Sequence, residues 1–217
     1  MQFFANSNRS EDARLEGIVN EFLNKYYFNE GFEEVRWATE KRDQVAGIDV
    51  FLTSEKLGLD NAKVDIKSAV KYSDRYLGTY SLELSFIGRQ YKEKIGWFIN
   101  DELETEYYLL LYPKSTKHYT DIKTVDDIDN IEYYLVKKEA LKDFFKSRGY
   151  DKERLLDVCA NMREELGNGN NKLTWDSDSA NFHFSLTGYL AEQPINAVVK
   201  RQVYDKYAIM KGKIEKK

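Results

Sequence analysis

Two strand-like segments joined by a turn constrain the fold of this chain more than any other feature. Residues 45–52 (VAGIDVFL) form a short apolar run rich in β-branched side chains, and residues 62–70 (AKVDIKSAV) alternate apolar and polar positions. Residues 54–61, between them, are rich in turn-forming residues. We therefore expect two strands lying side by side in a hairpin.

Three charged residues stand inside these two segments. Asp49 is embedded in the first, and Asp65 and Lys67 lie two positions apart in the second. A charge in an apolar strand is costly unless it is paired or bound to a metal ion. Because side chains two apart point to the same face of a strand, Asp65 and Lys67 are expected to be neighbours, and the hairpin would bring Asp49 opposite Asp65.

An Asp on one strand of a hairpin and an Asp-x-Lys on the next resemble the signature of the PD-(D/E)XK nuclease superfamily. The resemblance covers roughly residues 10–112, with Gly47-Ile48 standing where a proline precedes the Asp in the motif that gives the family its name. It implies an α/β (α+β) fold with a restriction-endonuclease-like core, a mixed central β-sheet flanked by helices. It also implies that Asp49, Asp65 and the backbone carbonyl of Ile66 hold Mg²⁺, with Mn²⁺ as a substitute, and that Lys67 assists the attacking water or the transition state.

The same resemblance suggests two further acidic ligands. Residues 10–29 carry apolar side chains at the spacing of one helical face, and Glu16 lies at the border of that face. Residues 81–86 alternate like a strand, with Glu83 on its polar side. Both glutamates are therefore candidate metal-side carboxylates, and the alternative is that each faces solvent without a role.

A second Asp-Ile-Lys, at residues 121–123, shows that the tripeptide alone is a weak signal. It lies in a polar stretch and has neither a partner strand nor an embedded upstream aspartate. The prediction for Asp65 and Lys67 therefore depends on their hairpin context.

Composition excludes several other kinds of site. One cysteine, Cys159, and two histidines make an internal disulfide or a Cys- or His-based zinc centre untenable, so any metal is expected to be a hard ion held by carboxylates. No apolar run reaches the length of a membrane span, and the N-terminus lacks a secretory pattern, so we expect a cytoplasmic protein.

The net charge of −4 is not that of a typical nucleic-acid-binding protein, yet basic residues cluster near the proposed site. Four of them, interleaved with tyrosines, are candidates for phosphate contact: Lys71, Arg75, Arg89 and Lys92. A solvated surface explains the same cluster equally well.

The resemblance implies a PD-(D/E)XK-like nuclease core over residues 1–137, with an extension over 138–217 that packs on the core or completes it. Within the extension we expect helices at 138–148 and 151–166, a loop at 167–171, a strand at 182–187 and a helix at 195–210 that packs on the core, pairs with a second subunit or rests on DNA. The expected function is that of a Mg²⁺-dependent phosphodiesterase, a deoxyribonuclease of the endonuclease type. The alternative is a non-catalytic DNA-binding or protein-interaction module on the same fold.

Overall fold

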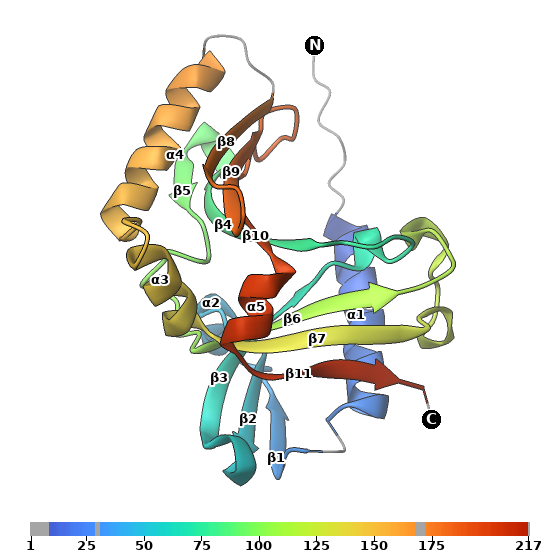
Figure 1. Ribbon diagram of the computed structural model, residues 1–217. Coiled ribbons are helices and arrows are strands. Elements are labelled where there is room, and N and C mark those ends of the chain that lie inside the picture. The colour runs from blue at the N-terminus through green and yellow to red at the C-terminus, as the bar shows by residue number, and fades with distance from the viewer. Residues whose placement is uncertain (1–8, 29–30, 168–171, 217) are drawn as a thin grey trace. The chain divides into compact units, whose positions relative to one another are not determined.

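The chain divides into two units that are interleaved in sequence (Figure 1). The computed structural model describes residues 9–28, 31–167 and 172–216. The first unit holds the residues up to Leu77, Thr105–Lys137 and those from Ala208 onward; the second holds Gly78–Glu104 and Lys138–Tyr207. The predicted boundary at residue 137 is one of the junctions. However, a continuous core over 1–137 is not what forms, because residues 78–104 pair into the second unit and the last strand returns to the first.

A six-stranded mixed sheet forms the centre of the first unit. Its strands lie in the order β1 (Glu34–Trp37), β2 (Val50–Ser54), β3 (Leu59–Ser68), β6 (Tyr107–Lys114), β7 (Asn130–Lys137) and β11 (Ala208–Glu215). Neighbouring strands are antiparallel except for β3 and β6, which are parallel. The expected hairpin is therefore present as β2 and β3, and the carboxyl ends of β3 and β6 meet at the same edge of the sheet.

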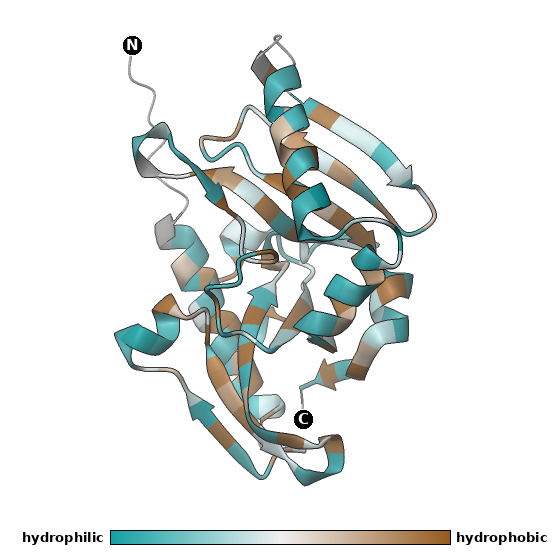
Figure 2. Ribbon diagram, turned by 90° about the vertical axis from the view of Figure 1, so that its left-hand side faces the viewer, coloured by the Kyte–Doolittle hydropathy of each residue, from teal (hydrophilic) through white to brown (hydrophobic). Residues whose placement is uncertain are grey.

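Helix α1 (Arg9–Tyr26) covers one face of this sheet and buries the apolar stripe predicted from its spacing. Leu15, Val19, Phe22 and Leu23 have at most 1% of their surface exposed. They pack in one cluster with side chains from β2, β3, β6 and β7. Burial of this many large apolar side chains is the main force that docks the helix on the sheet. Figure 2 shows hydrophobic residues recurring along the strands.

The second unit contains a five-stranded antiparallel sheet with three helices. The strands follow the order β5 (Glu93–Ile95), β4 (Thr79–Ile87), β10 (Ile195–Lys200), β9 (Phe182–Thr187) and β8 (Lys172–Asp178). The helices are α3 (Lys138–Lys146), α4 (Lys152–Gly167) and α5 (Arg201–Tyr207). Cys159 is buried in α4, and burial raises the pKa of its thiol to about 12, as expected for an inert cysteine.

None of the helices in the described part of the chain has the length and hydropathy that a membrane span requires.

Two local predictions were wrong. Residues 45–48 are not strand: helix α2 (Lys41–Val45) ends there, and Val45 is 70% exposed. Residues 195–210 form β10, α5 and the start of β11 instead of one helix, because Ile195, Ala197 and Val199 alternate inward in a sheet. The loop predicted at 167–171 lies, apart from its first residue, outside the described residues.

Candidate functional site

Asp49 is placed by a tight turn between α2 and β2. The turn depends on Gly47, whose φ of +75° lies in the left-handed region that favours glycine. The Gly47 N–H donates to the Gln44 carbonyl at 3.2 Å, and the hydroxyl of buried Thr105 donates to the Gly47 carbonyl at 2.6 Å. The chain thus changes direction two residues before Asp49, which fixes the carboxylate at the start of β2.

Asp65 and Lys67 lie on the same face of β3, as their spacing predicts. The Lys67 Nζ is 2.9 Å from the Asp65 Oδ1, and the aspartate side chain is only 5% exposed while that of the lysine is 29% exposed. A buried carboxylate therefore contacts an ammonium group that remains accessible to solvent. This is the arrangement required of a lysine that acts on a bound substrate.

The two aspartates meet across β2 and β3. Val50 pairs with Val64, so continuing that register by one residue sets Asp49 opposite Asp65. The Asp49 Oδ2 accepts the Ile66 N–H at 2.7 Å. Because the N–H and C=O of one strand residue point to the same side, the Ile66 carbonyl also faces Asp49. The two aspartates and the backbone of Ile66, whose carbonyl is the third donor that the resemblance implies, are thus neighbours.

Burial and the second carboxylate raise the pKa of Asp65. Loss of hydration is the largest cause, Asp49 adds its charge and a side-chain hydrogen bond, and Lys67 acts in the opposite direction; the resulting pKa is about 7. Tyr108, which pairs with Asp65 on β6 and is fully buried, has its own pKa raised by burial and by the Asp65 charge. Two carboxyls this close hold either a shared proton or a cation.

The donor set fits a hard divalent ion that keeps part of its water shell. Mg²⁺ is commonly bound by one or two carboxylates with several waters, and Asp49, Asp65 and the Ile66 carbonyl supply such a set. Within the described ranges, no group of three or more His, Cys, Asp or Glu side chains is arranged to hold a metal ion. An ion at this place would therefore depend on two carboxylates, the carbonyl and water.

Glu16 of α1 belongs to the same electrostatic neighbourhood. Its side chain is exposed, yet its pKa is raised by partial loss of hydration and then by Asp49, while Lys67 lowers it. Lys71, in the short helix η2 (Val70–Tyr72), forms an ion pair with Asp12 of α1 at 2.5 Å. The edge of α1 that carries Glu16 is thereby held next to the end of β3.

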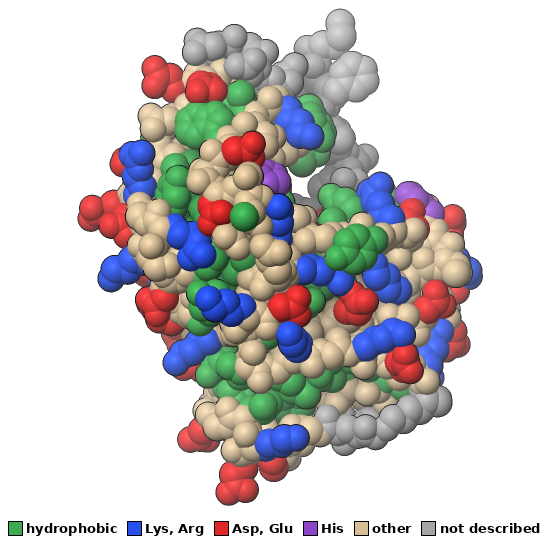
Figure 3. Space-filling model, in the orientation of Figure 1, with side chains coloured by type: hydrophobic (Ala, Val, Ile, Leu, Met, Phe, Trp, Pro, Cys, Tyr) green, Lys and Arg blue, Asp and Glu red, His purple; other side chains and the backbone are tan. Residues whose placement is uncertain are grey.

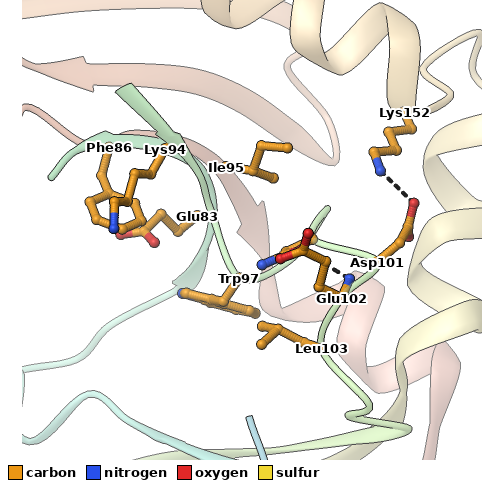
Figure 4. A pocket seen from close by; sticks show the side chains of 10 residues that line it. Glu83, Phe86, Lys94, Ile95, Trp97, Asp101, Glu102, Leu103 and Lys152 are labelled. Carbon is orange, nitrogen blue, oxygen red and sulfur yellow. Dashed lines mark hydrogen bonds and ion pairs between the residues drawn. The ribbon is translucent and has the colours of Figure 1, made fainter. Parts of the chain in front are cut away.

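Glu83, the other candidate carboxylate, does not lie on the sheet that carries Asp65. It lies on β4, which pairs with β10 of the second sheet, with Glu83 opposite Asn196. The chain enters the second unit after Leu77, so the strand that carries Glu83 belongs to a different sheet from β3. Glu83 instead lines a cavity within that unit, shown in Figure 4.

The four predicted phosphate-binding residues are divided in the same way. Lys71 and Arg75 belong to the first unit, and exposed Lys92 belongs to the second. Arg89 lies in η3 (Arg89–Tyr91) of the second unit, and its side chain is outside the described part of the structure.

A group of cations and tyrosines, which we call the aromatic–basic patch, lies at the paired ends of β3 and β6. It consists of exposed Tyr72, Arg75 and Tyr76 and of half-buried Lys114. The Arg75 guanidinium is 5.0 Å from the Tyr72 ring, and the Lys114 ammonium donates to the Arg75 carbonyl at 2.9 Å and lies 5.7 Å from the Tyr76 ring. Tyr72 is 45% and Tyr76 75% exposed. Elsewhere, the face in Figure 3 shows positive and negative side chains interspersed.

Sequence reasoning missed Lys114 and Tyr108 as members of this region. Both lie on β6, and only the parallel pairing of β6 with β3 brings them near Asp65 and the aromatic–basic patch. The register of β6 against β3 is not encoded in any local sequence pattern.

Comparisons with known proteins add no family assignment. No protein-family model matches the chain, and neither a curated protein nor a solved structure matches it.

Proposed function

We propose that this protein is a Mg²⁺-dependent nuclease that hydrolyses DNA phosphodiester bonds, with Asp49, Asp65 and Lys67 at its active site. One observation carries the proposal: buried Asp65 and half-buried Asp49 lie across a β-hairpin, and an accessible lysine contacts Asp65. The residue types and their order are those of the PD-(D/E)XK signature. The geometry supports the proposal because the three groups converge as that signature requires.

The chemistry assigns a different task to each residue. Asp49, Asp65 and the Ile66 carbonyl would hold the ion, which when bound polarises a phosphate oxygen and lowers the pKa of a coordinated water. Lys67 is held at 2.9 Å by Asp65, so its ammonium is directed beside the carboxylates. There it stabilises the negative charge that develops on the phosphoryl oxygens, and loss of one such preorganised group costs roughly 10²–10³ in rate.

The aromatic–basic patch supports DNA as the substrate. Arginine and lysine neutralise phosphates, and exposed tyrosines offer faces on which bases stack. The patch follows the carboxyl ends of β3 and β6, and β3 carries Asp65 and Lys67. A DNA strand bound along the patch would therefore pass the end of β3, which carries Lys67.

The test compares the two Asp-Ile-Lys sequences of the chain. Lys67→Ala should reduce Mg²⁺- or Mn²⁺-dependent cleavage of plasmid and linear DNA at least 100-fold. Lys123→Ala, which removes an exposed ammonium bonded to the Thr120 carbonyl, should leave cleavage unchanged. Circular dichroism confirms that both variants are folded. Equal cleavage by Lys67→Ala and the wild type would refute the assignment.

Calorimetric titration with Mn²⁺ separates an enzyme from a non-catalytic module. Binding of one ion that is lost in Asp49→Asn supports the active site. An absence of Mn²⁺ binding to the wild type, or binding unaffected by Asp49→Asn, would favour a DNA-binding or protein-interaction module.

A further inference from the structure

The aromatic–basic patch presents two tyrosine rings from a backbone that is fixed beneath them. Val70 is buried in the core of the first unit and anchors the short helix η2. The Tyr72 N–H donates to the Ala69 carbonyl at 2.9 Å, and the Ser115 N–H donates to the Ser73 carbonyl at 3.0 Å, which ties this segment to the end of β6. Rings carried by a fixed backbone lose little conformational freedom when a ligand binds.

Each of the two rings lies beside a cation. The Arg75 guanidinium is 5.0 Å from the Tyr72 ring centroid, and the Lys114 ammonium is 5.7 Å from the Tyr76 ring centroid. Because the Lys114 ammonium also donates to the Arg75 carbonyl, the two ring–cation pairs are adjoining parts of one surface. A nucleotide combines a flat base with a phosphate, and each pair offers a stacking face beside a positive charge. The patch therefore contains twice the combination that contacts one nucleotide.

Exposure of these rings determines which form of DNA they can contact. Tyr76 is 75% and Tyr72 is 45% exposed, so both rings are open to a ligand from solvent. In duplex DNA the faces of an internal base are covered by the neighbouring base pairs, and a surface tyrosine reaches them only if a step is unstacked, which costs free energy. Unpaired bases present their faces without this cost.

The cations of the patch do not by themselves favour a single strand. Duplex DNA carries a higher density of phosphate charge, so Arg75 and Lys114 alone would bind the duplex more tightly. A preference for the single strand therefore has to come from stacking, and each stacked base is worth roughly 5- to 150-fold in affinity. Two exposed rings are enough to reverse the preference that charge alone would give.

We propose that the aromatic–basic patch binds unpaired DNA, with bases stacked on Tyr72 and Tyr76 and phosphates beside Arg75 and Lys114, and that single strands are therefore cleaved in preference to duplex DNA. The inference rests on the proposed function, because it names the form of DNA that reaches Lys67. Strand β3 ends at Ser68 and η2 begins at Val70, so Lys67 and the patch follow each other closely along the chain. Stacking is possible for every base, so no sequence preference is expected.

The binding test uses the full chain without metal, so that no strand is cut. In fluorescence anisotropy, a labelled strand of about 20 nucleotides should bind at least tenfold more tightly than the same strand annealed to its complement. Raising the salt concentration should widen this ratio, because salt weakens phosphate contacts and not stacking. Equal or tighter binding of the duplex, or a ratio that vanishes as salt is raised, would overturn the proposal. Tighter binding of an RNA strand of the same sequence would also overturn it, by assigning the patch to RNA.

Matched variants test the role of the rings. Tyr72→Leu and Tyr76→Leu should each weaken binding of the single strand at least fivefold, whereas Tyr72→Phe and Tyr76→Phe keep the ring and should restore most of that binding. The control is Tyr189→Leu, which removes a tyrosine of the second unit that is 70% exposed and should have no effect. Equal losses in the leucine and phenylalanine variants, or no loss in either leucine variant, would contradict stacking. If a leucine variant does not fold, the ratio of single-strand to duplex affinity in the wild type still decides.

Cleavage assays separate this inference from the assignment of the active site. With Mg²⁺, and with DNA below its dissociation constant, the wild type should cut the single strand at least tenfold faster than the duplex, and Tyr76→Leu should reduce this ratio at least fivefold. Faster cleavage of the duplex would overturn the inference and leave Asp65 and Lys67 as the active site. Full cleavage by Lys67→Ala would instead refute the active site, and the binding ratios measured without metal would still decide whether the patch binds unpaired DNA.

Discussion

Replacing Asp65 by asparagine should stabilise the protein at alkaline pH while it abolishes cleavage. The pKa of Asp65 is raised from an ordinary value of 3.8 to about 7, mainly by burial. Between pH 4 and 7 the folded protein therefore binds more protons than the unfolded chain, and its stability falls as the pH rises through this window. Above pH 7 the folded protein bears the full cost of a buried, ionised carboxylate.

The size of the effect follows from the same pKa values. The folded and ordinary pKa values of Asp65 differ by about three, which corresponds to at most about 4 kcal/mol, because a pKa difference of one is worth about 1.4 kcal/mol. This cost is a net value, because the favourable contact with Lys67 already lowers the pKa of Asp65 toward its ordinary value. We therefore expect Asp65→Asn to raise the free energy of unfolding by up to about 4 kcal/mol at pH 8.5 and to change it little at pH 4.

Urea denaturation at both pH values provides the measurement. The variant pair Trp97→Phe, Trp175→Phe leaves Trp37 of β1 as a fluorescence probe in the first unit alone. Asp121→Asn, in the second Asp-Ile-Lys, is the control and should stay within ~0.5 kcal/mol of the parent. Mg²⁺ at ten times its dissociation constant should stabilise the parent by about 1.4 kcal/mol and leave Asp65→Asn unaffected. Equal destabilisation by Asp65→Asn at both pH values would show that the ion pair, and not the buried charge, governs this site.

Three further perturbations follow from the geometry. Glu16→Gln should lower the cleavage rate about tenfold without loss of stability, because the Glu16 carboxylate interacts electrostatically with Asp49 and Lys67 from an exposed position on α1. Unchanged kinetics would exclude Glu16 from the proposed site. Gly47→Ala should destabilise the first unit by about 1–2 kcal/mol, because the φ of Gly47 is +75°. Gly17→Ala in α1, where a Cβ has open space, should instead stabilise this unit by ~0.5–1 kcal/mol. Thermal unfolding of both variants measures this contrast. Arg75→Ala should weaken DNA binding and reduce the slope of log affinity against log salt by about one, and an unchanged slope in filter-binding assays would exclude a phosphate contact.

The sequence was sufficient to predict the relative placement of Asp49, Asp65 and Lys67, because local periodicity and one short connection determine it. Alternation in β3 put Asp65 beside Lys67, and the hairpin put Asp49 opposite Asp65. The spacing of apolar residues in α1 likewise predicted the face that carries Leu15 and Phe22 inward. Each of these relations joins residues that are close in sequence, so the pattern contains the information.

Relations between distant segments could not be predicted in this way. Alternation around Glu83 identified a strand correctly but could not say which sheet it joins, since that depends on pairing with β10 more than a hundred residues later. Tyr108 reaches Asp65 only through the register of β6 on β3. Residues 195–210 contain apolar positions that fit both a helix and a strand, and pairing with β4 and β9 selects the strand for 195–200.

The late position of β11 in the chain has a consequence for how the protein is made. The strand that completes the sheet of the first unit is synthesised only after all residues of the second unit, and it pairs along the full length of β7. Until then β7 presents an unpaired edge, which is the kind of surface on which strands of other chains add and aggregates begin. On the ribosome, the sheet of the first unit can therefore be completed only after the second unit has been translated, and we expect the pairing of β11 with β7 to form last.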